Sequence, residues 1–440
     1  MKYLIETYGC QMNKAESAAL QQTLHAYNWE ETQEIAQADF VIINTCVVRA
    51  TAENRAWSRI KQLCALKKQK HFYLLITGCL AENQKNSIQT LAPEVDFVLG
   101  NFQKNNFEAI VQSIDKRIKT PQFEEKPVYQ FSTYHGTRGA LQALVPISHG
   151  CNNFCTYCIV PYVRGRETAR SPESILYELD ALAANGVREI TLIGQNVNSY
   201  QWNDATLNIG FAKLLDMIAE HCKHTAIQRI RFLTSHPKDL SFDIINIMKK
   251  HEIIAKHLHL CVQHGSDTIL KAMNRHYTSE HYLNLVQLLR KEIPEITLST
   301  DILIGFPGEI EEDVTKTIEL MKQAQFIYSF MYYYNPRKGT PAASMPNQIP
   351  VAQKKERLAR IIAVQKELTR TVMQKFIGKK LIVLVEGISK RKKTELLART
   401  EQDIMVCFEG DQSLIGKFCM VDISSISGNT FKGKLLQVLE

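Results

Sequence analysis

The stretch Gly150-Cys151-Asn152-Asn153-Phe154-Cys155-Thr156-Tyr157-Cys158 places three thiols in one short loop, directly after the apolar run Leu144-Val145-Pro146-Ile147. Thiolates this close together repel one another unless a soft metal shares their charge, and they select zinc, copper(I) or iron–sulfur clusters. Three ligands are one short of a closed zinc site, and no further Cys or His follows at close spacing. A [4Fe–4S] cluster held by three cysteines leaves one iron open, and S-adenosylmethionine (SAM) is a source of radical chemistry at such clusters. The spacing therefore predicts a SAM-binding [4Fe–4S] cluster at Cys151, Cys155 and Cys158, with a structural zinc site and a remote fourth ligand as the alternative.

Composition sets the broad class of the protein. A chain of 440 residues with 45% hydrophobic content is long enough for two or three packed domains. No run of about 18 apolar residues and no signal sequence occurs, so we expect an unexported cytoplasmic protein without a membrane span. The 11 cysteines are spread over a long chain, which favours reduced, partly metal-bound thiols over a disulfide framework. The net charge of +8 suits a nucleic-acid partner without requiring one.

A second set of three cysteines follows three short apolar runs near the start of the chain. The runs Tyr3–Ile5, Phe40–Ile43 and Phe72–Ile76 lead to Cys10, Cys46 and Cys79 respectively. Short apolar runs alternating with helical patterns indicate a parallel α/β sheet, whose strands end at one shared edge. Ligands gather at that edge in open α/β sheets. We therefore predict a second metal site at these cysteines, the alternative being three separate buried thiols.

The central part of the chain repeats the same alternation. With the run before the cysteine loop, strand candidates recur at residues 189–193, 229–233, 257–262, 297–304 and 330–334. Six β/α units predict a parallel (β/α)6 partial barrel with its active site at the carboxyl ends of the strands. Polar residues and glycines follow these ends, which favours a cofactor pocket there. The basic segment with Arg164 and Arg166, after the cysteine loop, is either a solvated face or a phosphate contact.

The remaining segments complete a three-domain α/β prediction. Helical periodicity is lost near residues 115–140, which predicts a linker, and a long amphipathic helix is expected at 351–376. Beyond it, alternating strands at 380–386, 404–408 and 418–423 predict a small β-barrel. The run Lys390-Arg391-Lys392-Lys393 in one of its loops is a solvated turn or an RNA contact. We expect an N-terminal α/β domain at 1–116, the partial barrel at 137–373 and the β-barrel at 376–440.

These motifs also carry a resemblance that covers the chain from end to end. The chain resembles the radical SAM methylthiotransferases, and within them the MiaB-type branch that acts on isopentenylated adenosine in tRNA. The β-barrel resembles a TRAM domain. The stretches that carry the resemblance are Glu6-Thr7-Tyr8-Gly9-Cys10-Gln11-Met12-Asn13, Asn44-Thr45-Cys46-Val47-Val48-Arg49, the Cys151–Cys158 loop, Gly194-Gln195-Asn196-Val197-Asn198, Gly305-Phe306-Pro307-Gly308-Glu309 and Val385-Glu386-Gly387-Ile388-Ser389-Lys390.

The resemblance implies two [4Fe–4S] clusters, a SAM-binding one at Cys151, Cys155 and Cys158 and an auxiliary one at Cys10, Cys46 and Cys79. It also implies that the SAM cofactor is lined by Tyr157, Gln195, Gln263, Asp301 and Gly305. The residues expected at RNA are Arg164, Arg166, Lys390, Arg391, Lys392 and Lys393. Two positions depart from the family pattern. His264 stands where serine is expected and is predicted to alter cofactor or substrate contacts, and Ala398 stands where glycine is expected and is predicted to affect RNA affinity.

The implied reaction converts N6-isopentenyladenosine, next to the tRNA anticodon, to its 2-methylthio derivative by hydrogen abstraction at C2, sulfur insertion and methylation. The implied partners are the tRNA anticodon loop and a flavodoxin-type reductant, and the implied state is a monomer. Related methylthiotransferases act on N6-threonylcarbamoyladenosine or on a ribosomal protein, and Gln11-Met12-Asn13 favours the isopentenyl branch over these. From another class, the chain would be a non-catalytic zinc- and RNA-binding protein, and iron with acid-labile sulfide distinguishes the two.

Overall fold

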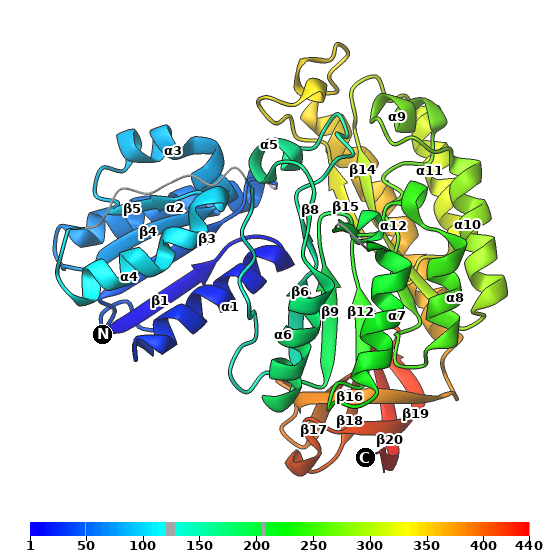
Figure 1. The fold of residues 1–440 in the computed structure, drawn as a ribbon. Coiled ribbons are helices and arrows are strands. Elements are labelled where there is room, and N and C mark those ends of the chain that lie inside the picture. Colours follow the sequence, from blue (N-terminus) through cyan, green and yellow to red (C-terminus); the bar gives the residue numbers. More distant parts are fainter. Residues whose placement is uncertain (49, 120–127, 205–206, 440) are drawn as a thin grey trace.

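The computed structural model describes residues 1–48, 50–119, 128–204 and 207–439. Three units follow one another along the chain: an α/β sandwich, a partial β/α barrel and a small closed β-barrel (Figure 1). This confirms the predicted fold class. Residues 120–127, at the centre of the predicted linker, and Arg49 of the Cys46 motif lie outside the described residues.

The N-terminal unit is built on a parallel sheet with the strand order β2-β1-β3-β4-β5. Its strands are β1 (Lys2–Thr7), β2 (Glu30–Glu31), β3 (Phe40–Thr45), β4 (Tyr73–Gly78) and β5 (Phe97–Leu99). The three predicted strands are therefore confirmed, and they are neighbours in the sheet. Every residue of the central strand β3 is buried, as expected for a parallel strand covered on both faces.

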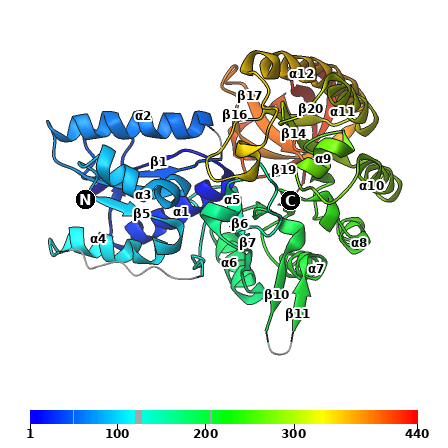
Figure 2. The ribbon, with the colours of Figure 1, turned by 90° about the horizontal axis from the view of Figure 1, so that it is seen from above.

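Helices cover both faces of this sheet (Figure 2). They are α1 (Gln11–Ala26), α2 (Ala50–Lys67), α3 (Cys79–Leu91) and α4 (Phe107–Asp115). Ile60 of α2 and Leu80 of α3 pack in one apolar core with alternate residues of β3, whereas Leu24 of α1 and Ile110 of α4 pack in the other. Alternate side chains of β3 thus pack into two separate apolar cores, one on each face of the sheet.

The central unit contains the six predicted parallel strands in sequence order. They are β6 (Gln142–Pro146), β9 (Glu189–Ile193), β12 (Arg229–Phe232), β13 (His257–His259), β14 (Thr297–Ile304) and β15 (Tyr328–Tyr333). Two three-stranded sheets are joined by the parallel bridges Ile230 to Ile254 and Ser235 to Leu260. The result is an open, curved parallel sheet, which confirms the predicted partial barrel.

Helices cover the outer face of this sheet and share one large apolar core with it. They are α6 (Pro172–Ala184), α7 (Phe211–Cys222), α8 (Phe242–Lys250), α10 (Ser279–Glu292), α11 (Glu311–Ala324) and α12 (Val351–Gln374), whereas α9 (Asp267–Ala272) packs in a separate small apolar cluster. The first begins with a side-chain cap, because Ser171 Oγ accepts a hydrogen bond from Ser174 N. Helix α12 corresponds to the predicted long helix. Small elements near the cysteine loop are β7 (Ser148–His149), α5 (Val160–Arg164) and β8 (Thr168–Ala169), and a hairpin is formed by β10 (Gln201–Asn203) and β11 (Asn208–Gly210).

The C-terminal unit is a closed barrel with the strand order β16-β17-β18-β20-β19. Its strands are β16 (Lys380–Ile388), β17 (Glu395–Thr400), β18 (Met405–Glu409), β19 (Phe418–Ser427) and β20 (Thr430–Leu439). Three of these strands match the sequence prediction, which did not include β17 and β20 as strands. β20 has a single buried position, so the apolar alternation that identifies a strand is weak in it. β17 does alternate between buried and half-buried positions, but its sequence, Glu395-Leu396-Leu397-Ala398-Arg399-Thr400, does not alternate apolar with polar residues.

The C-terminal barrel is fixed to the amino-terminal ends of the central strands. Arg229 donates a hydrogen bond to the carbonyl oxygen of Ile382 at 3.1 Å, and Arg231 donates one to that of Thr400 at 2.6 Å. Both arginines also form ion pairs with Glu189. The C-terminal barrel therefore lies at the edge of the central sheet opposite the cysteine loop (Figure 1).

Candidate functional site

The first three cysteines lie at the carboxyl edge of the N-terminal sheet. Cys10 precedes α1, Cys46 directly follows β3, and Cys79 is the first residue of α3 after β4. The structure brings them together as predicted: Cys46 is hydrogen-bonded to Cys79, and Cys10 interacts electrostatically with both. Close approach requires Gly9, which has φ +145°, because a Cβ there would lie 2.5 Å from the Cβ of Cys46.

An amide pair holds two of these cysteine loops together. Asn13 Nδ2 donates hydrogen bonds to Asn44 Oδ1 at 2.9 Å and to the carbonyl oxygen of Thr45 at 2.8 Å, and Asn44 Nδ2 donates in return to the carbonyl oxygen of Asn13. The Cys10 thiol donates to Asn13 Oδ1 at 3.2 Å. Both asparagines are buried. The loops after β1 and β3 are thus fixed in position by buried polar groups that satisfy each other.

Buried charges surround this cysteine set. Arg164 is only 2% exposed and its Nη1 lies 2.9 Å from Glu16 Oε1, while Lys104 Nζ lies 2.6 Å from Glu16 Oε2. The sequence prediction of Arg164 as an RNA contact is wrong, because a side chain this deeply buried cannot reach an RNA phosphate. Instead it interacts electrostatically with Cys79 and Cys10. A buried guanidinium next to thiols stabilises their anionic form.

Cys79 shows this effect. The hydrogen bond from Cys46 lowers the pKa of Cys79 to about 6, and the charges of Arg164 and Lys104 act in the same direction against its burial. The partner thiol has the opposite shift, since donating that hydrogen bond raises the pKa of Cys46. A set of three sulfurs with adjacent buried cations fits a cluster bound through thiolates, which are the form of cysteine that binds metal.

The second cysteine set lies in the loop after β6, which is anchored to the turn after α9. Thr156 N donates to the carbonyl oxygen of Met273 at 3.1 Å, and Asn274 Nδ2 donates to the carbonyl oxygens of Asn153 and Phe154. Gly150, before the loop, has φ +83°, and a Cβ there would lie 2.2 Å from the carbonyl oxygen of Arg166. These contacts therefore fix the shape of the loop.

The thiols of this loop are held in mostly buried surroundings. Burial raises the pKa of Cys151 to about 11 and that of Cys158 to about 12, with the neighbouring cysteines contributing in the same direction. Arg275 is buried and its Nη1 lies 3.4 Å from Cys155 Sγ. Three clustered thiols beside one fixed cation fit a cluster bound through thiolates, because metal binding removes the thiol protons.

A cavity of about 650 Å³ lies between the two cysteine-bearing units. The N-terminal unit contributes Val48 and Asn54, and the central unit contributes Tyr157, Gln263 and Asp301. Val48 is two residues from Cys46, and Tyr157 lies between Cys155 and Cys158. One cavity therefore borders both cysteine loops, and it contains three of the five predicted SAM contacts.

The other two predicted SAM contacts lie outside the lining of this cavity. Gln195 Oε1 accepts a hydrogen bond from Gly150 N at 2.5 Å and so supports the cysteine loop from behind. Gly305 N donates to Glu309 Oε2 at 2.7 Å. His264 has a structural role, because it is fully buried and its Nε2 lies 3.1 Å from Glu309 Oε2. His264 does not line the 650 Å³ cavity, so the structure gives no support to the prediction that it alters cofactor contacts.

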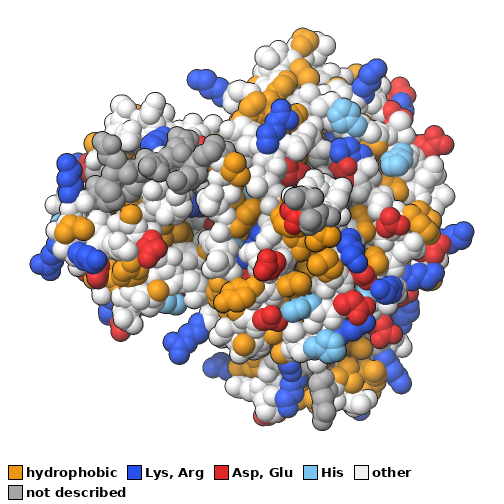
Figure 3. Space-filling view, in the orientation of Figure 1, with side chains coloured by type: hydrophobic (Ala, Val, Ile, Leu, Met, Phe, Trp, Pro, Cys, Tyr) orange, Lys and Arg blue, Asp and Glu red, His pale blue; other side chains and the backbone are white. Residues whose placement is uncertain are grey.

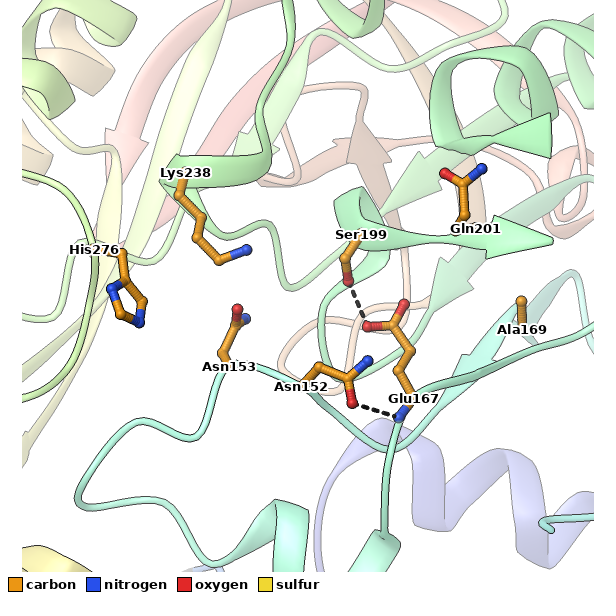
Figure 4. A pocket seen from close by; sticks show the side chains of 8 residues that line it. All are labelled: Asn152, Asn153, Glu167, Ala169, Ser199, Gln201, Lys238 and His276. Atoms are coloured by element: carbon orange, nitrogen blue, oxygen red, sulfur yellow. Dashed lines mark hydrogen bonds between the residues drawn. The ribbon is translucent and has the colours of Figure 1, made fainter. Parts of the chain in front are cut away.

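A second, smaller hollow of about 290 Å³ begins on the same cysteine loop, at Asn152 and Asn153 (Figure 4). Glu167 lies on its wall and its Oε2 accepts a hydrogen bond from Ser199 Oγ at 2.7 Å. Lys238 lies on the far side of the hollow in Figure 4. The residues that line this hollow are different from those that line the 650 Å³ cavity, so the two are separate.

The remaining predicted RNA contacts are exposed. Arg166 has its guanidinium 4.4 Å from the centre of the Phe154 ring, and Lys390, Arg391, Lys392 and Lys393 lie between β16 and β17. On the face shown in Figure 3, lysine and arginine side chains are scattered among acidic ones. Charge distribution on that face therefore does not mark an RNA site by itself.

Sequence reasoning missed the residues that connect the two units. Arg164 reaches back to Glu16 across 148 positions of sequence, and Arg337 Nη1 lies 2.8 Å from Glu53 Oε2 while its Nη2 donates to the carbonyl oxygen of Val48. Single charged residues so far apart carry no local signal of pairing.

Among the described residues, no helix has both the length and the apolar character needed to cross a membrane.

Family models match three successive parts of the chain. Residues 2–100 match the Uncharacterized protein family UPF0004, residues 145–321 match the Radical SAM superfamily, and residues 374–436 match the TRAM domain. Among solved structures, a radical S-adenosylmethionine methyltransferase, TsrM from Kitasatospora setae, superposes with a TM-score of 0.59 at 14% identity, covering 78% of this chain and 77% of that one. At that identity the likeness concerns the fold alone.

Relatives with known names match over the full length. A tRNA-2-methylthio-N(6)-dimethylallyladenosine synthase of Treponema denticola is 46% identical, covering 99% of this chain and 100% of the relative. The proteins of the same name from Treponema pallidum and a Thermoanaerobacter species are 44% and 42% identical, each over 99% of this chain and over 99% and 93% of their own lengths. Full-length identity at this level, together with the two cysteine sets around one cavity, means that the chain belongs to the family of tRNA-2-methylthio-N(6)-dimethylallyladenosine synthases.

Proposed function

We propose that this protein is a radical SAM methylthiotransferase that converts N6-isopentenyladenosine, next to the anticodon of tRNA, to 2-methylthio-N6-isopentenyladenosine. The observation that carries the proposal is the cavity of about 650 Å³ that borders both cysteine loops. Hydrogen abstraction and sulfur insertion must occur at the same adenine carbon. A cavity shared by the two loops allows this, whereas two separate sites would not.

The chain's own residues have distinct parts in this proposal. Cys151, Cys155 and Cys158 hold a SAM-binding [4Fe–4S] cluster, and Cys10, Cys46 and Cys79 hold an auxiliary one. When bound, these clusters and SAM supply the radical that removes hydrogen from adenine C2, the sulfur atom and the methyl group. C2–H is neither acidic nor electrophilically labile, so an acid or base from the protein would not suffice.

The contacts around the cofactor are proposed from the same geometry. Tyr157, Gln263 and Asp301 line the cavity and contact SAM, while Gln195 positions the cysteine loop through Gly150 N. Gly305 supports the cavity wall through its hydrogen bond to Glu309. These side chains orient SAM and exclude water from the cavity, and none of them is assigned a proton transfer.

We infer domains at residues 1–116, 137–373 and 376–440, with the TRAM barrel binding tRNA through its exposed basic loop 390–393. A single-stranded anticodon loop lets a protein reach an unstacked base, which an adenine buried in this cavity requires. A flavodoxin-type protein supplies the electron, the enzyme acts as a monomer, and its substrate places it in the cytoplasm.

Deletion of the gene, followed by mass spectrometry of tRNA nucleosides, tests the function. The expected result is loss of the 2-methylthio group with isopentenyladenosine retained, restored by the wild-type gene and not by a Cys155→Ala gene. Loss from threonylcarbamoyladenosine or from a ribosomal protein instead would move the assignment to another branch of the family. Stoichiometric zinc without sulfide, after anaerobic purification, would indicate the non-catalytic RNA-binding class.

A further inference from the structure

A third cluster of metal-binding side chains lies in the central barrel, apart from the two cysteine sets. His259 is the last residue of β13, Cys261 follows two positions later, and Asp301 belongs to the neighbouring strand β14. One imidazole nitrogen, the thiol sulfur and one carboxylate oxygen all lie within 4.8 Å of one another. His259 and Cys261 are buried, and Asp301 also lines the cavity of about 650 Å³.

The separations of these atoms match those of ligands around one metal ion. His259 Nε2 lies 3.5 Å from Asp301 Oδ2, and Cys261 Sγ lies 3.4 Å from the same oxygen. A tetrahedral zinc ion with bonds of about 2.0–2.3 Å places neighbouring N, O and S ligands roughly 3.3–3.6 Å apart. The Cys261 thiol donates a hydrogen bond to this oxygen, and His259 forms an ion pair with it. An ion bound at the same three atoms would replace the protons that these groups share.

The histidine is held in the orientation that a metal ligand needs. His259 Nδ1 lies 2.9 Å from Ser299 Oγ, and the imidazole packs edge-to-face against the Phe330 ring at 5.7 Å. Histidines that bind metal commonly use the second ring nitrogen in a hydrogen bond, which fixes the ring and the tautomer. Nε2 is thereby directed at Asp301 Oδ2.

We propose that His259, Cys261 and Asp301 bind a divalent cation of borderline softness, with Zn²⁺ as the best match to one nitrogen, one sulfur and one oxygen ligand. Three protein ligands leave one coordination position for water or a small molecule. Because Asp301 lies on the cavity wall, the ion would sit at the edge of the cavity where SAM and the adenine are proposed to meet. This site is additional to the two iron–sulfur sites and does not depend on the proposed substrate.

The experiment uses holoenzyme reconstituted anaerobically with iron and sulfide, so that both cysteine sets are occupied before zinc is added. One equivalent of ZnCl₂ is added, loosely bound metal is removed by dialysis against a weak chelator, and zinc, iron and sulfide are measured. Wild type, Cys261→Ala and Cys222→Ala are compared. Cys222 is a buried thiol at the end of α7 in the same unit and serves as the matched control.

We expect wild type and the control to retain about one zinc per chain, and Cys261→Ala to lose at least ten times more of it, with iron and sulfide equal in all three. Zinc K-edge absorption should show one sulfur at about 2.3 Å and nitrogen or oxygen at about 2.0–2.1 Å. Equal zinc retention in Cys261→Ala, or a zinc shell of three or more sulfurs, would overturn the proposal. The second result would place zinc at a cluster site, and neither result bears on the tRNA assay.

Discussion

Nη1 of Arg275 lies 3.4 Å from Sγ of Cys155, and Nη2 of the same guanidinium donates to the carbonyl oxygen of Cys261 at 2.6 Å. One buried cation thus connects the cysteine loop to the strand region that carries the proposed zinc ligand. Positive charge and hydrogen bonds at the sulfurs are among the factors that set a cluster's reduction potential. Arg275 is therefore placed to make the SAM-binding cluster that is proposed at this loop easier to reduce.

We expect Arg275→Met to lower the reduction potential of that cluster, because the reduced form carries more negative charge near the missing guanidinium. One charge-assisted hydrogen bond of about 1.5 kcal/mol corresponds to about 60 mV for a one-electron couple. Redox titration followed by electron paramagnetic resonance measures the shift. Arg275→Lys keeps the charge and should recover part of it, whereas an unchanged potential in both variants with full iron content would contradict the assignment.

The three-cysteine loop gives a second prediction. Cys155→Ala removes one ligand, and we expect 5′-deoxyadenosine formation from SAM and dithionite to fall by about two orders of magnitude or more. The auxiliary set is untouched, so about half of the iron should remain. Cys64→Ala, a buried thiol in α2 outside both sets, is the control and should keep both iron and turnover. Native-rate turnover in Cys155→Ala would show that the loop does not hold the reactive cluster.

The cysteine sets were predictable because spacing in parallel α/β folds fixes where strand ends meet. Cys10, Cys46 and Cys79 follow β1, β3 and β4, and that periodicity is visible in the sequence. The role of Arg164 was not predictable: an arginine in a basic segment looks solvent-exposed until the fold places it against Glu16, which lies 148 positions earlier. Likewise Cys261, which lies outside both cysteine sets, has Asp301 as a polar neighbour only because β13 pairs with β14.

The burial of Arg164 leads to a stability prediction. Arg164→Ala leaves Glu16 buried with Lys104 as its remaining cationic partner, and removing one member of a buried ion pair costs about 3–5 kcal/mol. Arg166→Ala, two residues away and exposed, should change stability by less than about 0.5 kcal/mol. Urea unfolding of the two variants measures the difference. Equal destabilisation by both substitutions would contradict the buried ion pair.

The basic loop between β16 and β17 gives a prediction for RNA binding. Replacing Lys390, Arg391, Lys392 and Lys393 with alanine should weaken tRNA binding and flatten its salt dependence, by roughly one unit of log–log slope for each lost phosphate contact. Binding is measured by filter retention over about 50–200 mM salt. Lys249→Ala with Lys250→Ala, on the outer helix α8, removes exposed charge elsewhere and should leave the slope unchanged. An unchanged slope in the loop variant would mean that RNA contacts another surface.

Acidification should destabilise the central barrel through His257. Burial lowers the pKa of His257 to about 3, and its ring nitrogens contact Thr297 Oγ1 at 2.8 Å and Ser299 Oγ at 2.9 Å. The pKa of an unfolded histidine is about 6.5. Below that pH the unfolded chain therefore binds a proton that the folded protein does not bind. The stabilisation is therefore complete above about pH 6.5 and is lost as the pH falls from there towards 3.

From about pH 7 to about pH 5, this residue alone should cost about 2 kcal/mol of unfolding free energy. His257→Gln keeps an amide that can bond to the same hydroxyls and cannot titrate, so its urea midpoint should fall less over that range than the wild-type midpoint. The exposed His224, replaced in the same way, is the matched control. If His257→Gln and wild type lose stability in parallel, His257 is not the group that senses pH, and the buried His149 and His236, whose pKa values are also lowered by burial, are the next to substitute.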